Sequence, residues 1–512
     1  MYDLVLYNGK IYPMSEEGLS YSYMAIKNGV IKMLGNNFDQ KTITSENFID
    51  LEGASILPSF SDAHVHLVQT GLNYLGLNLN DLRTIDEILE RIAEKCQKTP
   101  AGKLIRGIHF DITNVEERRF PTRKELDEVS PNHPVWINSI EYHMSAVNSM
   151  ALHLVNLPYF IDGIARDERN LPKGFLSGKA SAFFRNRIFE NISDRDRMIG
   201  VSKAVNYGIS KGITSIHAME GGYTFHDKDV EFILKNQEQL PIDIHLFYQS
   251  YDVDKIIENG LKRIGGDIFV DGSFGSKTAA VTKNYLGTSG NGKLYFTDEE
   301  LDYFVKYALE NNLQISLHTI GDRAIAQALR SFKKYIKTEA HKALRHRLEH
   351  FELPREAHLD LAKELNIDIC VQPVFEHLWG HPGEMYEKRL GERYKETNKF
   401  SHYLEKGLRL IGGSDSDVTE LNPLLGIHTA VNHPKKISSI SVYEAVRMFT
   451  YNSQYSVFKE DVKGTLEANK IADFIVLDQD LFEIDSLSIK ETNVLKTFKD
   501  GKCIYSRGDQ FE

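Results

Sequence analysis

The fold of this chain is organised around the stretch Leu57-Pro58-Ser59-Phe60-Ser61-Asp62-Ala63-His64-Val65-His66-Leu67. An apolar run enters it, and two histidines follow at alternate positions. Residues i and i+2 of a β-strand point to the same face, so His64 and His66 would project together and could bind one metal ion. Taken alone, such a pair is more often two ordinary histidines near a strand end. The rest of the chain decides between these interpretations.

Over the middle of the chain, strand-like apolar runs alternate with helical stretches, which is typical of an α/β fold with a parallel sheet. Eight such runs can be found, at about residues 56–66, 212–217, 242–248, 268–271, 314–318, 346–350, 367–372 and 408–415. Eight parallel strands are the number that closes a (β/α)8 barrel. The sequence therefore predicts a TIM-type barrel.

The two ends of the chain read as short strands separated by turns such as Asn8-Gly9 and Asp500-Gly501, which are hairpin signals. Neither end is large enough to bury a core alone. We therefore predict that residues 1–57 and 455–512 pair as one small β-sandwich, discontinuous in sequence, with the barrel spanning 58–454.

A long segment separates the first barrel strand from the second. It contains helical pattern at 86–95 and strand pattern at 135–138, which does not fit a single crossover helix. We predict an inserted subdomain at about 70–195 over the barrel mouth, because the loops after barrel strands build active sites.

Composition narrows the function classes. The 512 residues are 41% hydrophobic and 26% charged, which is ordinary for a soluble globular protein. A net charge of −11 gives no electrostatic case for nucleic-acid or membrane partners. The sequence shows no bilayer-spanning run or signal-peptide pattern, and its three cysteines are widely spaced. We expect a cytoplasmic protein with neither a disulfide framework nor a cysteine zinc site.

Metal-capable side chains end several of the predicted strands. They are His64 and His66 on the first strand, His318 on the fifth, His350 on the sixth and Asp415 on the eighth. The carboxyl ends of barrel strands converge on one mouth, so these five side chains would surround one small volume. Imidazole and carboxylate suit zinc and related divalent ions. The sequence therefore predicts a divalent metal site, with Zn²⁺ the expected ion.

Such a site would perform hydrolysis. A divalent metal lowers the pKa of bound water from about 15.7 towards 7 and polarises the substrate carbonyl. Asp415 is placed to take a proton from this water and return it to the leaving amine. It could also serve only as a further ligand, and the two roles are compatible.

The motif set resembles the amidohydrolase superfamily, and within it the YtcJ-like branch, amidohydrolase family 3. The matching segments are 62–66, 212–215, 271–280, 318–324, 347–350, 413–415, 444–450 and 464–473, together with His143 and 147–152 in the insertion. The resemblance covers nearly the whole chain. It implies a metal-dependent (β/α)8 hydrolase with a β-sandwich, acting on C–N bonds of amide-like substrates.

One position departs from the family pattern. Many members carry Gly-x-Lys-x-Phe-x-Asp-Gly on strand four, where a carboxylated lysine bridges two metals. Here Asp267 stands at that place, within the segment 265–272. An aspartate carboxylate lies several bonds closer to the backbone and spans two ions less readily. We therefore expect one ion and leave a second open.

Five further residues are candidates for substrate binding. His217 ends the second strand, Lys277 lies where the family usually carries arginine, and Asp322 follows His318 and could hold the imidazole of a metal ligand. His143 and Trp379 would line the pocket from the insertion and a late loop. Packing, helix capping and solvation are the alternative explanations for these residues.

The function predicted first is hydrolysis of a non-peptide C–N bond in a small molecule, such as an N-substituted formamide, an N-acyl amine or a cyclic amide. A deaminase of an amino-heterocycle would use the same fold and metal. A binding protein without turnover is the third alternative, which the aspartate at 267 keeps open. Substrate identity is not encoded in these motifs, and a homodimer is left open.

Overall fold

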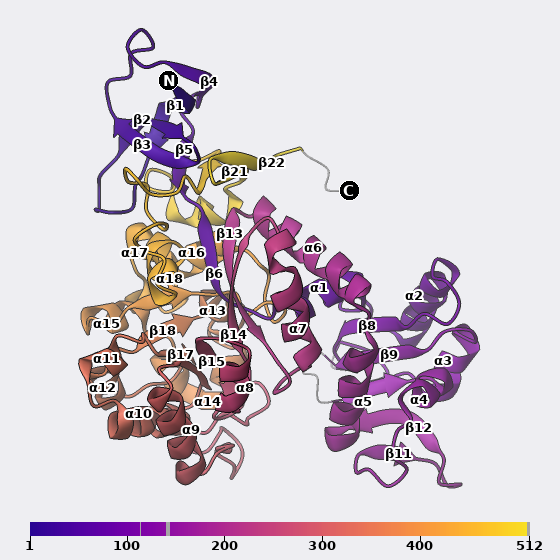
Figure 1. Ribbon diagram of the computed structural model, residues 1–512. Coiled ribbons are helices and arrows are strands. Elements are labelled where there is room, and N and C mark those ends of the chain that lie inside the picture. The colour runs from indigo at the N-terminus through magenta and orange to yellow at the C-terminus, as the bar shows by residue number, and fades with distance from the viewer. Residues whose placement is uncertain (113, 140–143, 509–512) are drawn as a thin grey trace. The chain divides into compact units, whose positions relative to one another are not determined.

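The computed structural model describes residues 1–112, 114–139 and 144–508 (Figure 1). The chain divides into two compact units. The first comprises residues 1–67, 205–224 and 233–512, and the second comprises 68–204 and 225–232. No helix in the described part of the chain is both long and apolar enough to cross a membrane.

The first unit contains a nearly closed barrel of eight parallel strands. In spatial order they are β6 (Phe60–Val65), β13 (Ile213–Glu220), β14 (Asp243–Tyr248), β15 (Arg263–Phe269), β16 (Gln314–Thr319), β17 (Arg347–His350), β18 (Asp368–Val371) and β19 (Leu410–Gly412). The segment after β19 returns to β6, where Ser416 bridges to Val65 in parallel. The predicted (β/α)8 barrel is confirmed.

Two barrel strands, the first and the fourth, begin at least four residues away from their predicted starts. The first run is split, because the amide of Ser59 donates to the Asp473 carbonyl while that of Phe60 donates to the Gly212 carbonyl. The apolar residues before Ser59 therefore belong to another sheet. The fourth strand begins earlier than predicted, at Arg263, because the strand continues through a pair of glycines that hides it in the sequence.

Helices follow the barrel strands and bury one apolar face each. α10 (Asp322–Tyr335) places buried residues such as Ala324, Ala328 and Phe332 at helical spacing. The other helices of this unit include α7 (Asp227–Asn236, part of which belongs to the second unit), α8 (Val253–Glu258), α9 (Asp298–Glu310), α11 (Glu339–Lys342), α12 (Glu356–Glu364), α13 (Pro373–Trp379), α14 (Met385–Leu390), α15 (Phe400–Glu405), α16 (Pro423–Val431), α17 (Val442–Met448) and α18 (Tyr451–Ser456).

Both ends of the chain build one further sheet in the first unit (Figure 1). Its order is β22 (Lys502–Ser506), β21 (Val494–Lys499), β20 (Phe474–Leu477), β5 (Ser55–Pro58), β1 (Tyr2–Ile11), β2 (Tyr21–Lys27) and β3 (Val30–Gly35), with β4 (Ser45–Asp50) also pairing with β1. Strand β5 joins the two ends, since it pairs with β20 antiparallel and with β1 in parallel. The predicted pairing of the chain ends is confirmed.

The second unit has its own sheet and core. The strand order is β11 (Ile164–Arg166), β12 (Pro172–Ser177), β10 (Met144–Val147), β9 (Val135–Ser139), β8 (Ile105–Phe110) and β7 (Leu77–Asn78). Its helices are α1 (Leu67–Leu75), α2 (Ile85–Gln97), α3 (Arg123–Val129), α4 (Ser149–Val155), α5 (Gly178–Asn191) and most of α6 (Asp194–Ser210). The segment predicted as an insertion, at about 70–195, lies in this unit. Its position over the barrel mouth stays a prediction.

Candidate metal centre

Six buried side chains meet at the carboxyl ends of the barrel strands, and we call them the ligand cluster. They are His64 in β6, His66 just beyond it, Asp267 in β15, His318 in β16, His350 at the end of β17 and Asp415 beyond β19. Each is at most 6% exposed. The structure thus brings together the five residues predicted as ligands and adds Asp267, which the sequence left outside the expected set.

Two carboxylates lie among the imidazoles. The Oδ1 atom of Asp415 is 3.3 Å from the Nε2 atoms of both His64 and His66. Asp267 places Oδ1 3.2 Å from Nε2 of His350 and Oδ2 3.6 Å from Nε2 of His66. The ring nitrogens of His64, His66 and His350 that face the carboxylates are therefore all Nε2.

The outer nitrogens of three of these imidazoles are held by acceptors. Nδ1 of His64 is 2.7 Å from Oε2 of Glu349, and Nδ1 of His66 is 3.0 Å from the Met219 carbonyl. Nδ1 of His350 is 2.8 Å from Oε1 of Gln372. An oxygen acceptor at Nδ1 holds the ring proton there, so Nε2 is the nitrogen that each of these imidazoles can offer to a metal.

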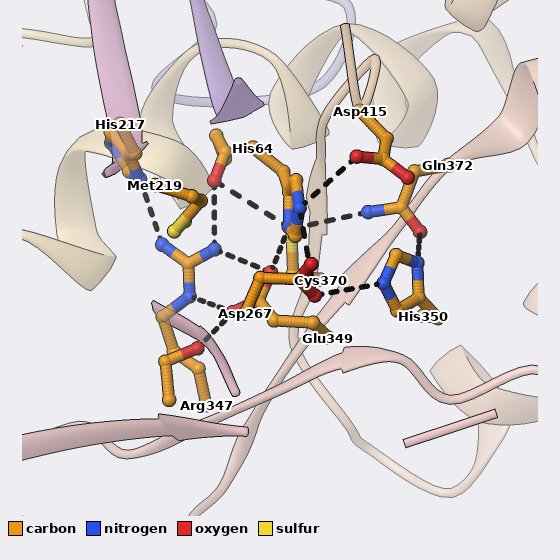
Figure 2. A network of polar contacts seen from close by, with 12 residues as sticks. His64, His217, Met219, Asp267, Arg347, Glu349, His350, Cys370, Gln372 and Asp415 are labelled. Carbon is orange, nitrogen blue, oxygen red and sulfur yellow. Dashed lines mark hydrogen bonds and ion pairs between the residues drawn. The ribbon is translucent and has the colours of Figure 1, made fainter. Parts of the chain in front are cut away.

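A buried ion pair supports the first of these contacts (Figure 2). Arg347 donates from Nε and a terminal nitrogen to the two oxygens of Glu349, at 2.8 and 2.9 Å. Its other terminal nitrogen is 2.9 Å from Nδ1 of His217, and its guanidinium lies over the ring of Phe247. Burial alone would raise the pKa of Glu349, but Arg347 and His64 outweigh it and hold that pKa well below its usual range.

Sequence reasoning did not select Arg347 or Glu349 as functional residues. The signal was present, because residues 347 and 349 are separated by two in a strand and must share a face. Both are 0% exposed. Two opposite charges on the inward face of a barrel strand indicate a buried ion pair, since charged side chains are rarely buried unless they are paired.

The backbone around two cluster residues is unusual. His350 and Asp415 have φ angles of 66° and 56°, in the left-handed region that non-glycine residues rarely adopt. The amide of Asp415 donates to the His64 carbonyl at 2.8 Å, and Oδ1 of Asp62 accepts from the amide of Ser414 at 2.9 Å. These contacts fix the segment after β19 against β6. Left-handed backbone at non-glycine residues is energetically unfavourable, and such residues concentrate at functional sites.

Two of the residues predicted to bind substrate, His217 and Asp322, contact other residues of the protein. His217 in β13 contacts Arg347, as described above, and burial followed by the charge of Arg347 lowers its pKa well below the ordinary value. Asp322 begins α10, where it accepts from the amide of Thr282 and forms an ion pair with Arg355. A substrate contact for either residue stays a prediction.

Trp379 is linked to the ligand cluster through one aromatic ring. Phe375 stacks on the His350 imidazole with ring centroids 6.0 Å apart, and Trp379 lies 4.8 Å from Phe375. Lys277 occupies the loop after β15 with a φ of 59°, and its side chain is half-buried. His143 lies outside the described residues.

A family model matches residues 47–505, which is most of the sequence. The chain belongs to the amidohydrolase family. This amidohydrolase is 29% identical to the putative amidohydrolase YtcJ of Bacillus subtilis, over 98% of this chain and 99% of the relative. It is 26% identical to the N-substituted formamide deformylase of Arthrobacter pascens, over 99% of both chains.

The same likeness extends to solved structures. An uncharacterised metal-dependent hydrolase from Pyrococcus furiosus superposes with a TM-score of 0.78 and 26% sequence identity, covering 94% of this chain and all of that one. The family match and the likeness to this solved hydrolase both support the conclusion that the protein is a hydrolase.

Proposed function

We propose that the protein is a metal-dependent amidohydrolase that cleaves a non-peptide C–N bond, of amide or formamide type, in a small molecule. The observation that carries the proposal is the convergence of four imidazoles and two carboxylates at the barrel mouth, all buried. The relative from Arthrobacter pascens, which is an N-substituted formamide deformylase, supports the same substrate class.

The donor set fits a divalent cation. Nε2 of His64 and Oδ1 of Asp415 are buried and face each other at 3.3 Å, but in the described part of the chain neither atom makes a hydrogen bond of good geometry. Leaving such atoms unsatisfied costs free energy unless another partner is present. Imidazole nitrogens and carboxylate oxygens are the ligands that zinc and related ions prefer. His64, His66, His318, His350, Asp267 and Asp415 would hold the metal.

Different residues of the chain would then orient the metal ligands and transfer the proton. A bound divalent ion supplies Lewis acidity and lowers the pKa of water. Glu349, Gln372 and the Met219 carbonyl hold the imidazoles in the orientation that exposes Nε2. Asp415 would accept the proton of the attacking water and donate it to the leaving nitrogen, as a general base and then acid.

Aromatic residues beside the cluster favour an apolar group next to the cleaved bond. Phe269 lies 4.8 Å from the His318 ring, and Phe375 stacks on His350. Apolar rings in contact with these imidazoles lower the local dielectric and so strengthen the electrostatic interactions there.

The test combines metal quantification with a substrate panel. We expect bound divalent metal, and amine release from formamides, N-acyl amines or cyclic amides. Asp415→Asn should keep its fold and lose about 10²- to 10⁴-fold in kcat, the range for removal of a general acid–base group. Asp461→Asn, at an exposed aspartate, is the matched control.

Three results would contradict the proposal. Metal-free protein that is fully active would exclude metal dependence. An Asp415→Asn variant as active as wild type would exclude the proton-transfer role. Ammonia release from amino-purines or amino-pyrimidines, without turnover of any amide, would show a deaminase on the same fold.

A further inference from the structure

We propose that an open cavity beside helices α12 and α15 binds a small organic carboxylate, at a place separate from the ligand cluster. The cavity has a volume of about 360 Å³, which lies within the range of small-molecule sites. It is formed by the segments that follow β15 and β17, by the first residue of α10, by the chain between α14 and α15, and by residues of α12 and α15. All of its lining residues lie outside the ligand cluster, so the inference does not depend on the proposed function.

The charged residues around the cavity leave an excess of positive charge. Each of its three carboxylates already has a cationic partner: Asp322 pairs with Arg355, Glu396 with Lys399, and Glu356 with His402 and Lys406. Lys283 and Arg393 also line the cavity, and neither forms an ion pair with any carboxylate in the described part of the chain. Two cations therefore remain for an anionic ligand.

Arg393 is held in place while N–H donors remain on its guanidinium. Its Nε donates to the Leu390 carbonyl at 3.2 Å, and its terminal nitrogens donate to the carbonyls of Lys283 and Asn284 at 3.0 and 2.6 Å. Each terminal nitrogen carries a second N–H, so donors are left for a ligand oxygen. The carbonyls fix the guanidinium without neutralising its charge, and a guanidinium binds a carboxylate through charge-assisted hydrogen bonds.

Apolar side chains make up another part of the wall. Leu353, Leu359 and Tyr403 line the cavity and are at most 7% exposed, and Pro354 also lines it. Inorganic phosphate would leave these groups without an apolar contact. A carboxylate with an apolar body would bury apolar surface as well as pair with the two cations. The lining therefore favours an organic carboxylate over phosphate.

The cavity lies against the loops of three barrel strands. Thr282 follows β15, Asp322 follows β16 and Arg355 follows β17, and all three line the cavity. Asp322 joins the other two, since it accepts from the amide of Thr282 at 2.8 Å and pairs with Arg355 at 2.5 Å. A molecule that binds only the folded protein stabilises it. A carboxylate bound against these joined loops should therefore raise the thermal midpoint.

The experiment compares benzoate with two probes that each lack one feature of the proposed ligand. Benzamide has the same ring without the charge, and inorganic phosphate has the charge without an apolar body. Calorimetric titration of the full chain should give the tightest binding with benzoate, which should also raise the thermal midpoint. Arg393→Gln should weaken benzoate binding about 10- to 100-fold, the worth of a hydrogen bond to a charged group. Lys283→Met should cause a smaller loss, because solvent screens an exposed lysine.

Control variants identify where benzoate binds. Lys262→Met, at an exposed lysine outside the cavity, should keep the wild-type affinity. Benzoate held by a metal ion in the ligand cluster would bind equally well in all of these proteins. Equal affinity in wild type, Lys283→Met and Arg393→Gln therefore overturns the proposal, and so does a wild type that does not bind benzoate.

Two further results are decisive. Phosphate that binds more tightly than benzoate, with the same losses in the variants, overturns the assignment to an organic carboxylate. If circular dichroism shows that Arg393→Gln is misfolded, Lys283→Met decides alone, because the exposed Lys283 side chain can be replaced without disturbing the core.

Discussion

At the residue scale, Glu349 connects the metal-binding face of the cluster to the barrel interior. Its carboxylate accepts from Arg347 on one side and contacts Nδ1 of His64 on the other. A buried ion pair loses its hydration, so it is tolerated only where further hydrogen bonds satisfy both charges. Here His64, Ser316 and His217 provide those bonds.

This arrangement predicts the effect of Glu349→Gln. The neutral amide cannot hold the His64 imidazole as strongly, so metal affinity should fall about 10- to 100-fold, the usual cost of removing such a partner. Arg347 would also be left buried without a countercharge, which typically costs about 3–5 kcal/mol. A chelator-competition titration and the thermal midpoint in EDTA measure the two effects. Glu356→Gln, at an exposed glutamate, is the control, and equal metal affinity in both variants would refute the role of Glu349.

At the element scale, β15 depends on a glycine. A Cβ atom on Gly265 would lie 2.0 Å from the carbonyl oxygen of Ser316 in β16, and the residue has a φ of 95°. The strand can therefore approach β16 and place Asp267 only because this side chain is absent.

We expect Gly265→Ala to lower the thermal midpoint by several degrees and to reduce bound metal, because backbone atoms of both strands must move. Left-handed backbone alone costs an alanine about 1–2 kcal/mol. Gly275→Ala, in the loop that follows, meets no atom closer than 3.8 Å and is the matched control. A Gly265→Ala protein with the thermal midpoint and metal content of that control would show that the glycine is dispensable.

At the scale of the whole molecule, acid stability depends on buried histidines far apart in the sequence. Burial is the main cause that lowers the pKa values of His245, His346 and His433 to about 3. Each is neutral in the folded protein, whereas the unfolded chain takes up protons below about pH 6.5. The stability linked to these groups is complete above that pH and is lost as the pH falls from 6.5 towards 3.

His346→Gln tests this dependence. Nδ1 of His346 accepts from the amide of Ile315 at 3.0 Å, a contact that a glutamine oxygen can replace. Each such histidine contributes up to about 1.4 kcal/mol per pH unit in this range. The thermal midpoint should therefore fall less between pH 7 and pH 5 in His346→Gln than in wild type. His153→Gln, at an exposed histidine, should keep the wild-type slope, and identical slopes in all three proteins would contradict the assignment.

Local pattern was sufficient to predict the barrel and the five histidine and aspartate candidates, because strand periodicity sets which side chains share a face. Parallel strands then bring their carboxyl ends to one mouth. Local pattern was not sufficient at Ser59, where the apolar run changes partners between two sheets, nor at the start of β15, where glycines interrupt the apolar signal.

The sequence by itself thus determined the barrel, the family and the identity of the metal-capable side chains at the strand ends. Only the tertiary structure placed Asp267 within reach of both His64 with His66 and His318 with His350. It also connected His217, through Arg347 and Glu349, to Nδ1 of His64. The physical reason is distance along the chain. Glu349 and His64 are 285 residues apart, and whether two such side chains touch depends on the closure and register of the whole barrel.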